Sequence, residues 1–184
     1  MGRKALLVID MLRDFLDPEG ALYCGDQARE IVPKVLELLE EHRRRGSLIV
    51  FVADHHEPGD REFELFPPHC VEGTPGAQLL PQFQAGPGEH LVRKRRYSAF
   101  FGTTLDQYLQ EQKVDHLVLC GINTHACIRT AAIDAYQRDY RVLLPRECIG
   151  SYDDEHARVT MRYLDGKIGR VIGVEDVVEM VRAT

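Results

Sequence analysis

Hydrophobic residues in this chain occur either in short uninterrupted runs or at helical spacing. The first run, from Ala5 to Ile9, lies between Lys4 and Asp10. An uninterrupted apolar run of this kind is typical of a strand that is covered on both faces, as in a parallel sheet. By the same pattern, further strands are expected at residues 48–53, 89–93, 116–121, 140–144 and 169–173.

Helical spacing is found between these runs. Apolar residues recur at Ile31, Val35 and Leu38 up to the segment 43–46, where arginines and a glycine suit the end of a helix. Pro33 fits the first turn of that helix, because its missing N–H is not needed there. Further helices are expected around 77–83, from Thr103 or Thr104 to 112, at 124–138, from Ser151 or Asp153 to about 165, and at 174–181.

Strands that alternate with helices predict an α/β sandwich around a mainly parallel sheet. A length of 184 residues is ordinary for one domain. No internal repeat, low-complexity tract or linker divides the sequence. We therefore expect a single domain over residues 1–184.

The charge of the chain limits its partners. A net charge of −6 argues against a general nucleic-acid binder, because such binding depends largely on cations that neutralise phosphates. Residues 93–96, Arg-Lys-Arg-Arg, form a local basic run, which is either a phosphate or nucleic-acid patch or a solvated strand end. We interpret the run as mostly a solvated strand end in which only Lys94 has a function.

Cysteine usage and the N-terminal sequence indicate the compartment. The five cysteines are odd in number and scattered, which favours a reducing compartment over a disulfide framework. The first apolar run meets Asp10 too early to be a signal sequence or a membrane span. We therefore expect a cytoplasmic protein with no membrane partner. No Gly-x-Gly-x-x-Gly follows the first strand and no P-loop occurs, so dinucleotide and triphosphate binding lack sequence support.

Polar side chains with useful chemistry follow four predicted strands. They are Asp10, Asp54, Lys94 and Cys127. Ligands of open α/β sheets bind beyond the carboxyl ends of the strands, so these side chains are expected in one site. Cys127 lies near the start of a predicted helix, whose free N–H groups favour a thiolate and could hold an oxyanion. The alternative is that Cys127 is a small apolar residue of the core, as free cysteines usually are.

The segment 54–76 is rich in Pro and Gly, is long for a simple connection, and contains a candidate metal site. The candidate ligands are Asp54, His56, His69 and, as a further possibility for the set, Glu62. Two imidazoles with one or two carboxylates suit Zn(II), with Mn(II) or Fe(II) as alternatives. His55 is expected to point away, since side chains alternate along an extended backbone. Ordinary solvated loop histidines are the alternative interpretation.

Several short motifs follow one another in order along the chain. They are Leu6-Leu7-Val8-Ile9-Asp10-Met11 with Asp14-Phe15, Asp54-His55-His56, Leu65-Phe66-Pro67-Pro68-His69 with Gly73-Thr74, Lys94 with Tyr97-Ser98-Ala99-Phe100, and residues 121–127. In this combination the chain resembles the isochorismatase-like cysteine hydrolases, and among them most closely the nicotinamidases. The resemblance spans nearly the whole sequence. It implies a Rossmann-like, three-layer α/β/α fold with a six-stranded parallel sheet in the order 3-2-1-4-5-6.

The resemblance also implies roles for individual residues. The implied catalytic triad is Asp10, Lys94 and Cys127. The implied ligands of a divalent metal are Asp54, His56 and His69, and some nicotinamidases have a further Glu or His ligand where this chain has Glu62. A cis peptide is implied between Ile122 and Asn123, and the backbone N–H groups of Asn123 and Cys127 would form an oxyanion hole.

The main functional hypothesis is metal-dependent hydrolysis of nicotinamide to nicotinate and ammonia, a step of NAD metabolism, through a thioester on Cys127. The substrate ring would pack against Phe15, Phe66 and Tyr97. One alternative is hydrolysis of another small amide or N-carbamoyl compound, because Asn123 and His125 stand where nicotinamidases usually have a small apolar residue and an Asp. Another alternative is a binding module without activity. A homo-oligomer is expected.

Overall fold

A six-stranded parallel sheet forms the centre of the computed structural model, which describes residues 2–183. The strands are β1 (Arg3–Ile9), β2 (Leu48–Asp54), β3 (His90–Lys94), β4 (Val114–Gly121), β5 (Arg141–Pro145) and β6 (Arg170–Ile172). Their order is β3-β2-β1-β4-β5-β6, and every neighbouring pair is parallel. The predicted sheet, its order and its direction are confirmed.

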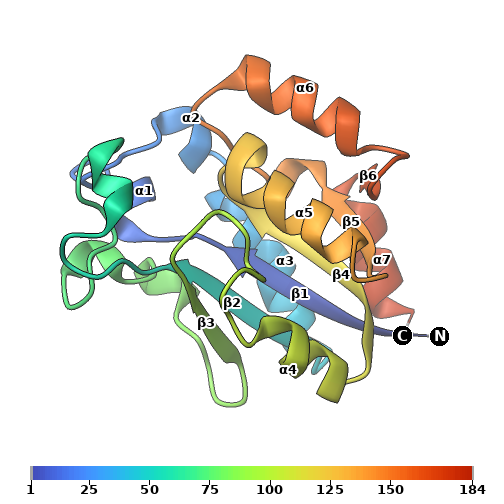
Figure 1. Cartoon of the computed structure of the whole chain (residues 1–184). Helices are drawn as coiled ribbons and strands as arrows, with labels where there is room; N and C mark the ends of the chain where they lie inside the picture. The colour runs from blue at the N-terminus through green and yellow to red at the C-terminus, as the bar shows by residue number, and fades with distance from the viewer. Residues whose placement is uncertain (1, 184) are drawn as a thin grey trace.

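Helices cover both faces of the sheet, as Figure 1 shows. On one face lie α3 (Val32–Arg44) and α7 (Val174–Arg182), and on the other lie α4 (Leu105–Glu111), α5 (Arg129–Tyr136) and α6 (Asp154–Leu164). Successive residues of β1 face opposite sides, so Leu6 and Val8 belong to one core and Leu7 and Ile9 to the other. Within residues 2–183, no helix is long and apolar enough to cross a membrane.

The strand order reverses direction at β1, which pairs with β2 on one side and β4 on the other. In register, Ile9 lies beside Gly121, and Asp54 lies beside Lys94 on β3. The carboxyl ends of these four strands therefore meet at one edge, where open α/β sheets bind their ligands.

The helix ends largely follow the predicted signals. Pro33 lies in the first turn of α3, and Gly46, just beyond that helix, has a φ of 60°. The carboxylate of Asp153 caps α6 by accepting a hydrogen bond from the N–H of His156 at 2.8 Å. At α4 the residue before the helix is Thr104, but the hydroxyl of Thr103 accepts the N–H of Leu105.

The prediction of one helix over residues 77–83 is wrong. The chain forms two 3₁₀ turns there, Pro75–Ala77 and Pro81–Phe83, with an extended stretch between them in which Leu79 bridges to Leu12. Proline lacks an N–H and starts a turn readily but cannot continue a helix, so the two prolines divide the segment. Two short helices that the pattern did not indicate, α1 (Arg13–Leu16) and α2 (Asp26–Arg29), are each too short to show a helical period.

The helix predicted at 124–138 begins in an unexpected way. Its first turn, Thr124–Ile128, is a π-helix, and the α-helix α5 starts only at Arg129. The carbonyl of Asn123 accepts the N–H groups of both Ala126 and Ile128. This wide turn places Cys127 above the carboxyl end of the sheet, since π-turns shift the side chains that they contain.

Candidate active site and metal cluster

Asp10, Lys94 and Cys127 lie in contact at the carboxyl edge of the sheet. The Nζ atom of Lys94 is 2.9 Å from Oδ2 of Asp10 and 3.5 Å from Sγ of Cys127. Only 1% of Asp10, 1% of Lys94 and 6% of Cys127 is exposed, so bulk water does not screen these contacts. The structure thus brings together the three residues that were predicted as a triad, while their roles stay a prediction.

The backbone at Asp10 directs its carboxylate into the site. Asp10 has a φ of 56°, in the left-handed region that Asp tolerates better than most residues. Its N–H donates to the carbonyl of Val52, and its Oδ1 accepts the N–H of Asp54 at 2.9 Å. These bonds fix one oxygen of the carboxylate on β2 and leave the other toward Lys94 and Cys127.

Lys94 remains a cation in this buried place. Burial alone would lower the pKa of its ammonium, but the carboxylates of Asp10 and Asp54 outweigh burial and raise that pKa well above its usual value. Lys94 can therefore hold two carboxylates and the sulfur of Cys127 in one arrangement.

The surroundings of Cys127 favour the thiol over the thiolate, which differs from the expectation for a cysteine near a helix start. Burial raises the pKa of the Cys127 thiol well above its usual value; Lys94 opposes this shift, but Asp10 and Asp54 add to it. Burial also raises the pKa of Asp10, against the effect of Lys94. Asp10 and Cys127 both contact Nζ of Lys94, so a carboxylate that can accept the thiol proton is held beside the sulfur.

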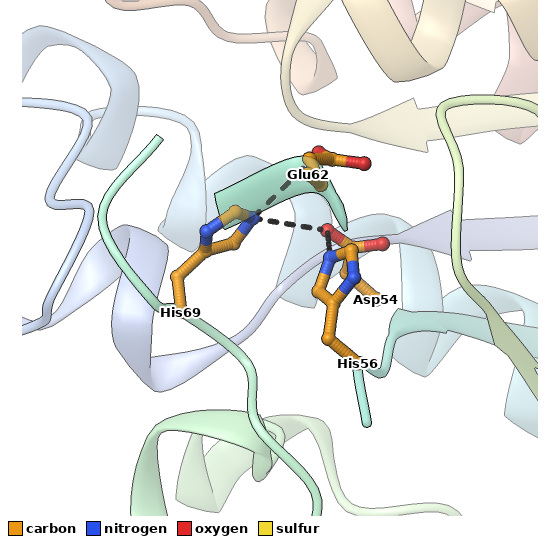
Figure 2. A group of neighbouring side chains, drawn as sticks. All are labelled: Asp54, His56, Glu62 and His69. Atoms are coloured by element: carbon orange, nitrogen blue, oxygen red, sulfur yellow. Dashed lines mark hydrogen bonds and ion pairs between the residues drawn. The ribbon is translucent and has the colours of Figure 1, made fainter. Parts of the chain in front are cut away.

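A second cluster lies beside the first, in the segment after β2. Its ligand atoms come from Asp54, His56, Glu62 and His69 and all lie within 4.8 Å of one another. Figure 2 shows the two imidazole rings turned toward the carboxylate of Asp54. Nε2 of His56 is 3.1 Å from Oδ2 of Asp54, and Nε2 of His69 is 3.6 Å from the same oxygen and 3.9 Å from Oε1 of Glu62.

Hydrogen bonds on the far side of each ring fix its orientation. Nδ1 of His56 lies 3.1 Å from Oδ2 of Asp60, and Nδ1 of His69 lies 2.8 Å from the carbonyl of Pro67. Each Nδ1 is therefore the donor, so in the neutral rings the lone pair is on Nε2, the nitrogen that faces Asp54 inside the cluster. Two imidazole nitrogens with carboxylate oxygens are a donor set that fits zinc. His55 lies beside Glu72 instead, outside the cluster as expected.

Asp54 joins the two clusters. Its Oδ1 is 3.2 Å from Nζ of Lys94, and its Oδ2 faces His56 and His69. A charge change at either cluster is therefore felt at the other through one carboxylate.

Aromatic rings surround the metal cluster. The rings of Phe15 and Phe66 lie 5.6 and 6.3 Å from that of His69. Phe63, which the sequence did not single out, lies 5.4 Å from the ring of His56. Tyr97 is 43% exposed and lines an outer groove of about 750 Å³ together with Phe66. Contact of Phe15, Phe66 or Tyr97 with a substrate stays a prediction.

The peptide between Ile122 and Asn123 is cis, as the resemblance implied. The N–H of Asn123 has no hydrogen-bond acceptor within residues 2–183, which suits an oxyanion donor. The side-chain amide of Asn123 contacts Sγ of Cys24 at 3.4 Å. His125 turns the other way, with Nδ1 2.9 Å from the hydroxyl of Ser151 and its ring 4.8 Å from that of Tyr152.

Two buried carboxylates with a place in the site were missed from the sequence. Asp60 contacts His56, and Asp14 accepts the N–H of Cys70, next to His69, at 2.7 Å. The sequence indicated Asp14 only as part of a motif with Phe15. Asp60 lies in an irregular segment, where no periodicity indicates which side chains turn inward. A carboxylate four residues after a candidate histidine ligand was the one available signal for Asp60.

The interpretation of the basic run is also corrected. Arg95 and Arg96 were expected to be solvated, but Nε of Arg95 and Nη1 of Arg96 each lie 3.1 Å from the carboxylate of Asp60. Both side chains stay about half exposed while they hold this carboxylate.

Comparison with known proteins identifies the family. The model of the isochorismatase domain matches residues 4–176. The chain belongs to the isochorismatase family. Within this family, PncA of Bacillus subtilis is 34% identical over 91% of this chain and 97% of its own. The solved structure of that protein, described as a nicotinamidase, superposes with a TM-score of 0.87 at 31% identity and covers 92% of this chain and 98% of its own.

Two further solved structures are similar to this chain over most of its length. An isochorismatase-like hydrolase from Alkaliphilus metalliredigens has a TM-score of 0.92 at 31% identity, covering 97% of this chain and 98% of its own. The pyrazinamidase of Pyrococcus horikoshii, solved in complex with zinc, has a TM-score of 0.85 at 30% identity and covers 93% and 99% of the two chains.

Among curated relatives, a maleamate amidohydrolase of Pseudomonas putida is 32% identical over 98% of this chain and 88% of its own. A protein of Arabidopsis thaliana named "Probable inactive nicotinamidase" is 38% identical over 74% of each chain. The chain is thus an isochorismatase-family hydrolase whose relatives include amidases of more than one specificity.

Proposed function

We propose that this isochorismatase-family hydrolase converts nicotinamide to nicotinate and ammonia through a thioester on Cys127. The observation that supports this proposal most is the buried contact of Asp10, Lys94 and Cys127 beside a cluster of metal-binding donors. The relatives described as nicotinamidase and pyrazinamidase act on amides of aromatic nitrogen heterocycles, and they match this chain over more than nine tenths of its length.

The first half-reaction forms the thioester. Asp10 takes the proton from the Cys127 thiol, and the sulfur attacks the carbon of the amide. The oxygen of the tetrahedral intermediate accepts hydrogen bonds from the N–H groups of Asn123 and Cys127, which are worth about 3 kcal/mol in comparable sites. The C–N bond then breaks, and Asp10 returns its proton to the leaving nitrogen, which departs as ammonia.

The second half-reaction frees the enzyme. Asp10, again a carboxylate, takes a proton from water while the water oxygen attacks the thioester carbon. The C–S bond breaks and the sulfur of Cys127 regains a proton from Asp10. The product leaves as nicotinic acid, which loses its remaining carboxyl proton to water to give nicotinate. Throughout, the ammonium of Lys94 keeps both groups in contact and offsets the charge that moves between them.

Asp54, His56, His69 and Glu62 would hold a divalent metal in this proposal, with zinc suited best by the donor set and manganese or iron as alternatives. When bound, the metal supplies a Lewis-acid position for the ring nitrogen of the substrate. The rings of Phe15 and Phe66 are near enough to His69 to pack against a planar substrate there.

A second candidate is hydrolysis of another small amide or N-carbamoyl compound. Asn123 and His125 immediately before Cys127 favour it, because they differ from the residues usual in nicotinamidases. The maleamate amidohydrolase among the relatives shows that the family includes such substrates. A family member without activity is the third candidate, and the intact contacts of Cys127 argue against it.

Ammonia release from nicotinamide tests the main proposal. We expect turnover by the wild-type protein loaded with zinc, and a loss of at least a thousandfold in Cys127→Ala and in Asp10→Asn, because each variant lacks a reacting group. Cys148→Ala is the matched control, since Cys148 is also buried but lies outside the site, and it should keep its activity.

The same assay with a panel of other amides separates the candidates. Substantial turnover by Cys127→Ala contradicts the mechanism. A wild-type protein that prefers maleamate or an N-carbamoyl amino acid over nicotinamide contradicts the substrate but not the mechanism. No turnover of any amide, together with no labelling of Cys127 by a thiol reagent, supports the inactive candidate.

A further inference from the structure

Asp60 is a buried carboxylate that neither the triad nor the candidate ligands explain. Its side chain is 0% exposed, although it lies in a surface segment between β2 and β3. Oδ1 has two donors and Oδ2 has three, because Nη1 of Arg96 also lies 3.3 Å from Oδ2. Oδ1 lies 3.0 Å from the N–H of Glu62 and 3.1 Å from Nη1 of Arg96, and Oδ2 lies 3.1 Å from both Nε of Arg95 and Nδ1 of His56.

We propose that Asp60, held by Arg95 and Arg96, is a positioning residue that aims His56 into the metal cluster and thereby sets the affinity for a divalent cation such as zinc. This inference rests on the metal site of the proposed function.

The contact with His56 determines which ring nitrogen can bind a metal. Because Oδ2 of Asp60 accepts a hydrogen bond, Nδ1 of His56 must carry the proton, and the lone pair of the neutral ring is then on Nε2. Nε2 is the atom that faces Oδ2 of Asp54 inside the cluster. The ring of His56 is fully buried, and Asp60 is the acceptor that its Nδ1 has among the described residues.

The two arginines explain why a carboxylate can be buried at this place. Two guanidinium groups and a backbone N–H offset its charge and supply four of its five hydrogen bonds, and the fifth is with His56. Arg95 and Arg96 directly follow Lys94 at the end of β3, so the strand that supplies the predicted catalytic lysine also anchors the second side of the metal cluster.

Arg96 extends the same network to the fourth candidate ligand. Its Nη1 lies 3.5 Å from Oε2 of Glu62, while Oε1 of Glu62 faces His69. The carboxylate of Glu62 is thereby shared between the arginine and the cluster. Asp60 and Arg96 together hold the turn Arg61–Glu64 in the position that keeps Glu62 beside the histidines.

Glu57 provides a matched control on the same segment. Its Oε1 lies 3.4 Å from Nη1 of Arg95, so it shares an arginine with Asp60. Its side chain is 67% exposed and, within residues 2–183, forms no hydrogen bond or ion pair with the ring of His56. Glu57→Gln therefore removes one carboxylate charge from the same arginine without touching the ring.

The test is the zinc affinity of Asp60→Asn, measured by competition with a chromophoric chelator and compared with wild type, Glu57→Gln and His56→Ala. We expect Asp60→Asn to bind zinc 10- to 100-fold more weakly than wild type, the range usual for partners of metal-bound histidines. Glu57→Gln should equal wild type, and His56→Ala should lose more than Asp60→Asn. The spectrum of bound Co(II), used as a second probe, should change in Asp60→Asn, because the donor geometry at His56 changes.

The outcomes separate this inference from the proposed function. Wild-type affinity in Asp60→Asn, or an equal loss in Glu57→Gln, overturns the positioning role. If wild type itself binds no zinc, or if His56→Ala and His69→Ala bind it as tightly as wild type, then the metal site fails and the positioning role fails with it. Thermal unfolding of the metal-free proteins shows whether Asp60→Asn folds normally. If it does not, Arg95→Gln replaces it, and unchanged zinc affinity in that variant overturns the inference.

Discussion

Lys94 connects the two parts of the site at the scale of single residues. Its ammonium contacts Asp10 of the predicted triad and Asp54 of the metal cluster, at 2.9 and 3.2 Å. Coulomb interactions at these distances are strong in a buried place, and a carboxylate left without its cation would be costly. The charge states of the triad and of the metal cluster therefore depend on each other through one side chain.

His42 is a different kind of buried titratable residue, with no part in the site. It lies on α3 with 0% exposure, and neither ring nitrogen has a hydrogen-bond partner within residues 2–183. Burial lowers the pKa of His42 to about 4; Glu41 opposes this shift and Lys4 adds to it. The folded protein therefore keeps His42 neutral at pH values where the unfolded chain, with a pKa near 6.5, is protonated.

The sign of the effect on stability follows from proton binding. Between pH 6.5 and 4 the unfolded state binds more protons than the folded state, so the free energy of unfolding falls as the pH is lowered. The contribution of neutral His42 to the free energy of unfolding is fully present above pH 6.5 and is lost by about pH 4. The difference between the two pKa values corresponds to about 3 kcal/mol.

We therefore predict that His42→Leu loses less stability than wild type when the pH falls from 7.5 to 4. Urea unfolding at both pH values measures this difference, and all other titrating groups are common to the two proteins. The loss should be smaller in the variant by up to about 3 kcal/mol. Equal losses in the two proteins would show that His42 is protonated or hydrated in the folded state.

At the scale of elements, β4 approaches β1 closely at Gly121. This glycine has a φ of 115°, and a Cβ atom added to it would lie 1.9 Å from the carbonyl oxygen of Ile9. Gly121 comes directly before the cis peptide and the turn with Cys127, while Ile9 comes directly before Asp10. The absence of a side chain at this position thus determines how near Asp10 and Cys127 can lie.

Gly121→Ala is expected to destabilise the protein by about 3 kcal/mol or more, because the strained φ and the clash with backbone add together. The matched control is Gly102→Ala, since Gly102 has a φ of 67° but no atom within 4 Å of the added Cβ. It should cost about 1 kcal/mol. Thermal unfolding of the two variants gives the comparison, and a similar small loss in both would contradict the close approach.

At the scale of the whole molecule, the metal cluster joins the end of a sheet strand to the loop that follows it. Asp54 ends β2, whereas His69 lies on a loop that Asp14 attaches to α1 through the N–H of Cys70. A metal bound to both would tie the sheet to this loop, and would stabilise the folded state because the unfolded chain lacks the arrangement.

Removal of zinc is therefore expected to lower the melting temperature. At a free zinc concentration a hundred times the dissociation constant, binding adds about 2.7 kcal/mol, or roughly 5 to 10 °C for a chain of this size. Calorimetry with zinc and with a chelator measures the shift in wild type. The variant His69→Ala provides the control, since it should show little change between the two conditions.

Exposed apolar side chains at the surface are consistent with the predicted homo-oligomer. Leu65 and Phe101 are 83% and 66% exposed, and both line the outer groove together with Tyr97. Exposed apolar side chains that gather in one place are common where proteins associate. The homo-oligomer stays a prediction, as do the cytoplasmic location and the single domain.

Much of the fold could be predicted from the chain alone, because the relevant signals are local. The apolar runs of β1 and β2 are uninterrupted and end at Asp10 and Asp54, so both strands and both site residues were evident from neighbouring positions. The family resemblance added the strand order, which no local pattern contains. Spacing within one segment likewise indicated Asp54, His56 and His69 as a group.

Other features depended on contacts between distant residues. The sequence placed Cys127 at a helix start and favoured a thiolate there, but burial, together with the carboxylates of Asp10 and Asp54, raises its pKa. The helix predicted over 77–83 does not form, because two 3₁₀ turns that begin at prolines and the bridge between Leu79 and Leu12 occupy this segment.

The basic run at residues 93–96 shows most clearly what the sequence determines and what depends on the tertiary structure. The sequence alone determined that four cationic residues end a strand and that a histidine precedes an aspartate by four positions. Only the tertiary structure decided that Arg95 and Arg96 turn back from β3 onto Asp60, and that Asp60 meets His56. The physical reason is that a buried carboxylate requires donors from several segments at once, and which segments supply them is settled only when the sheet brings their ends together.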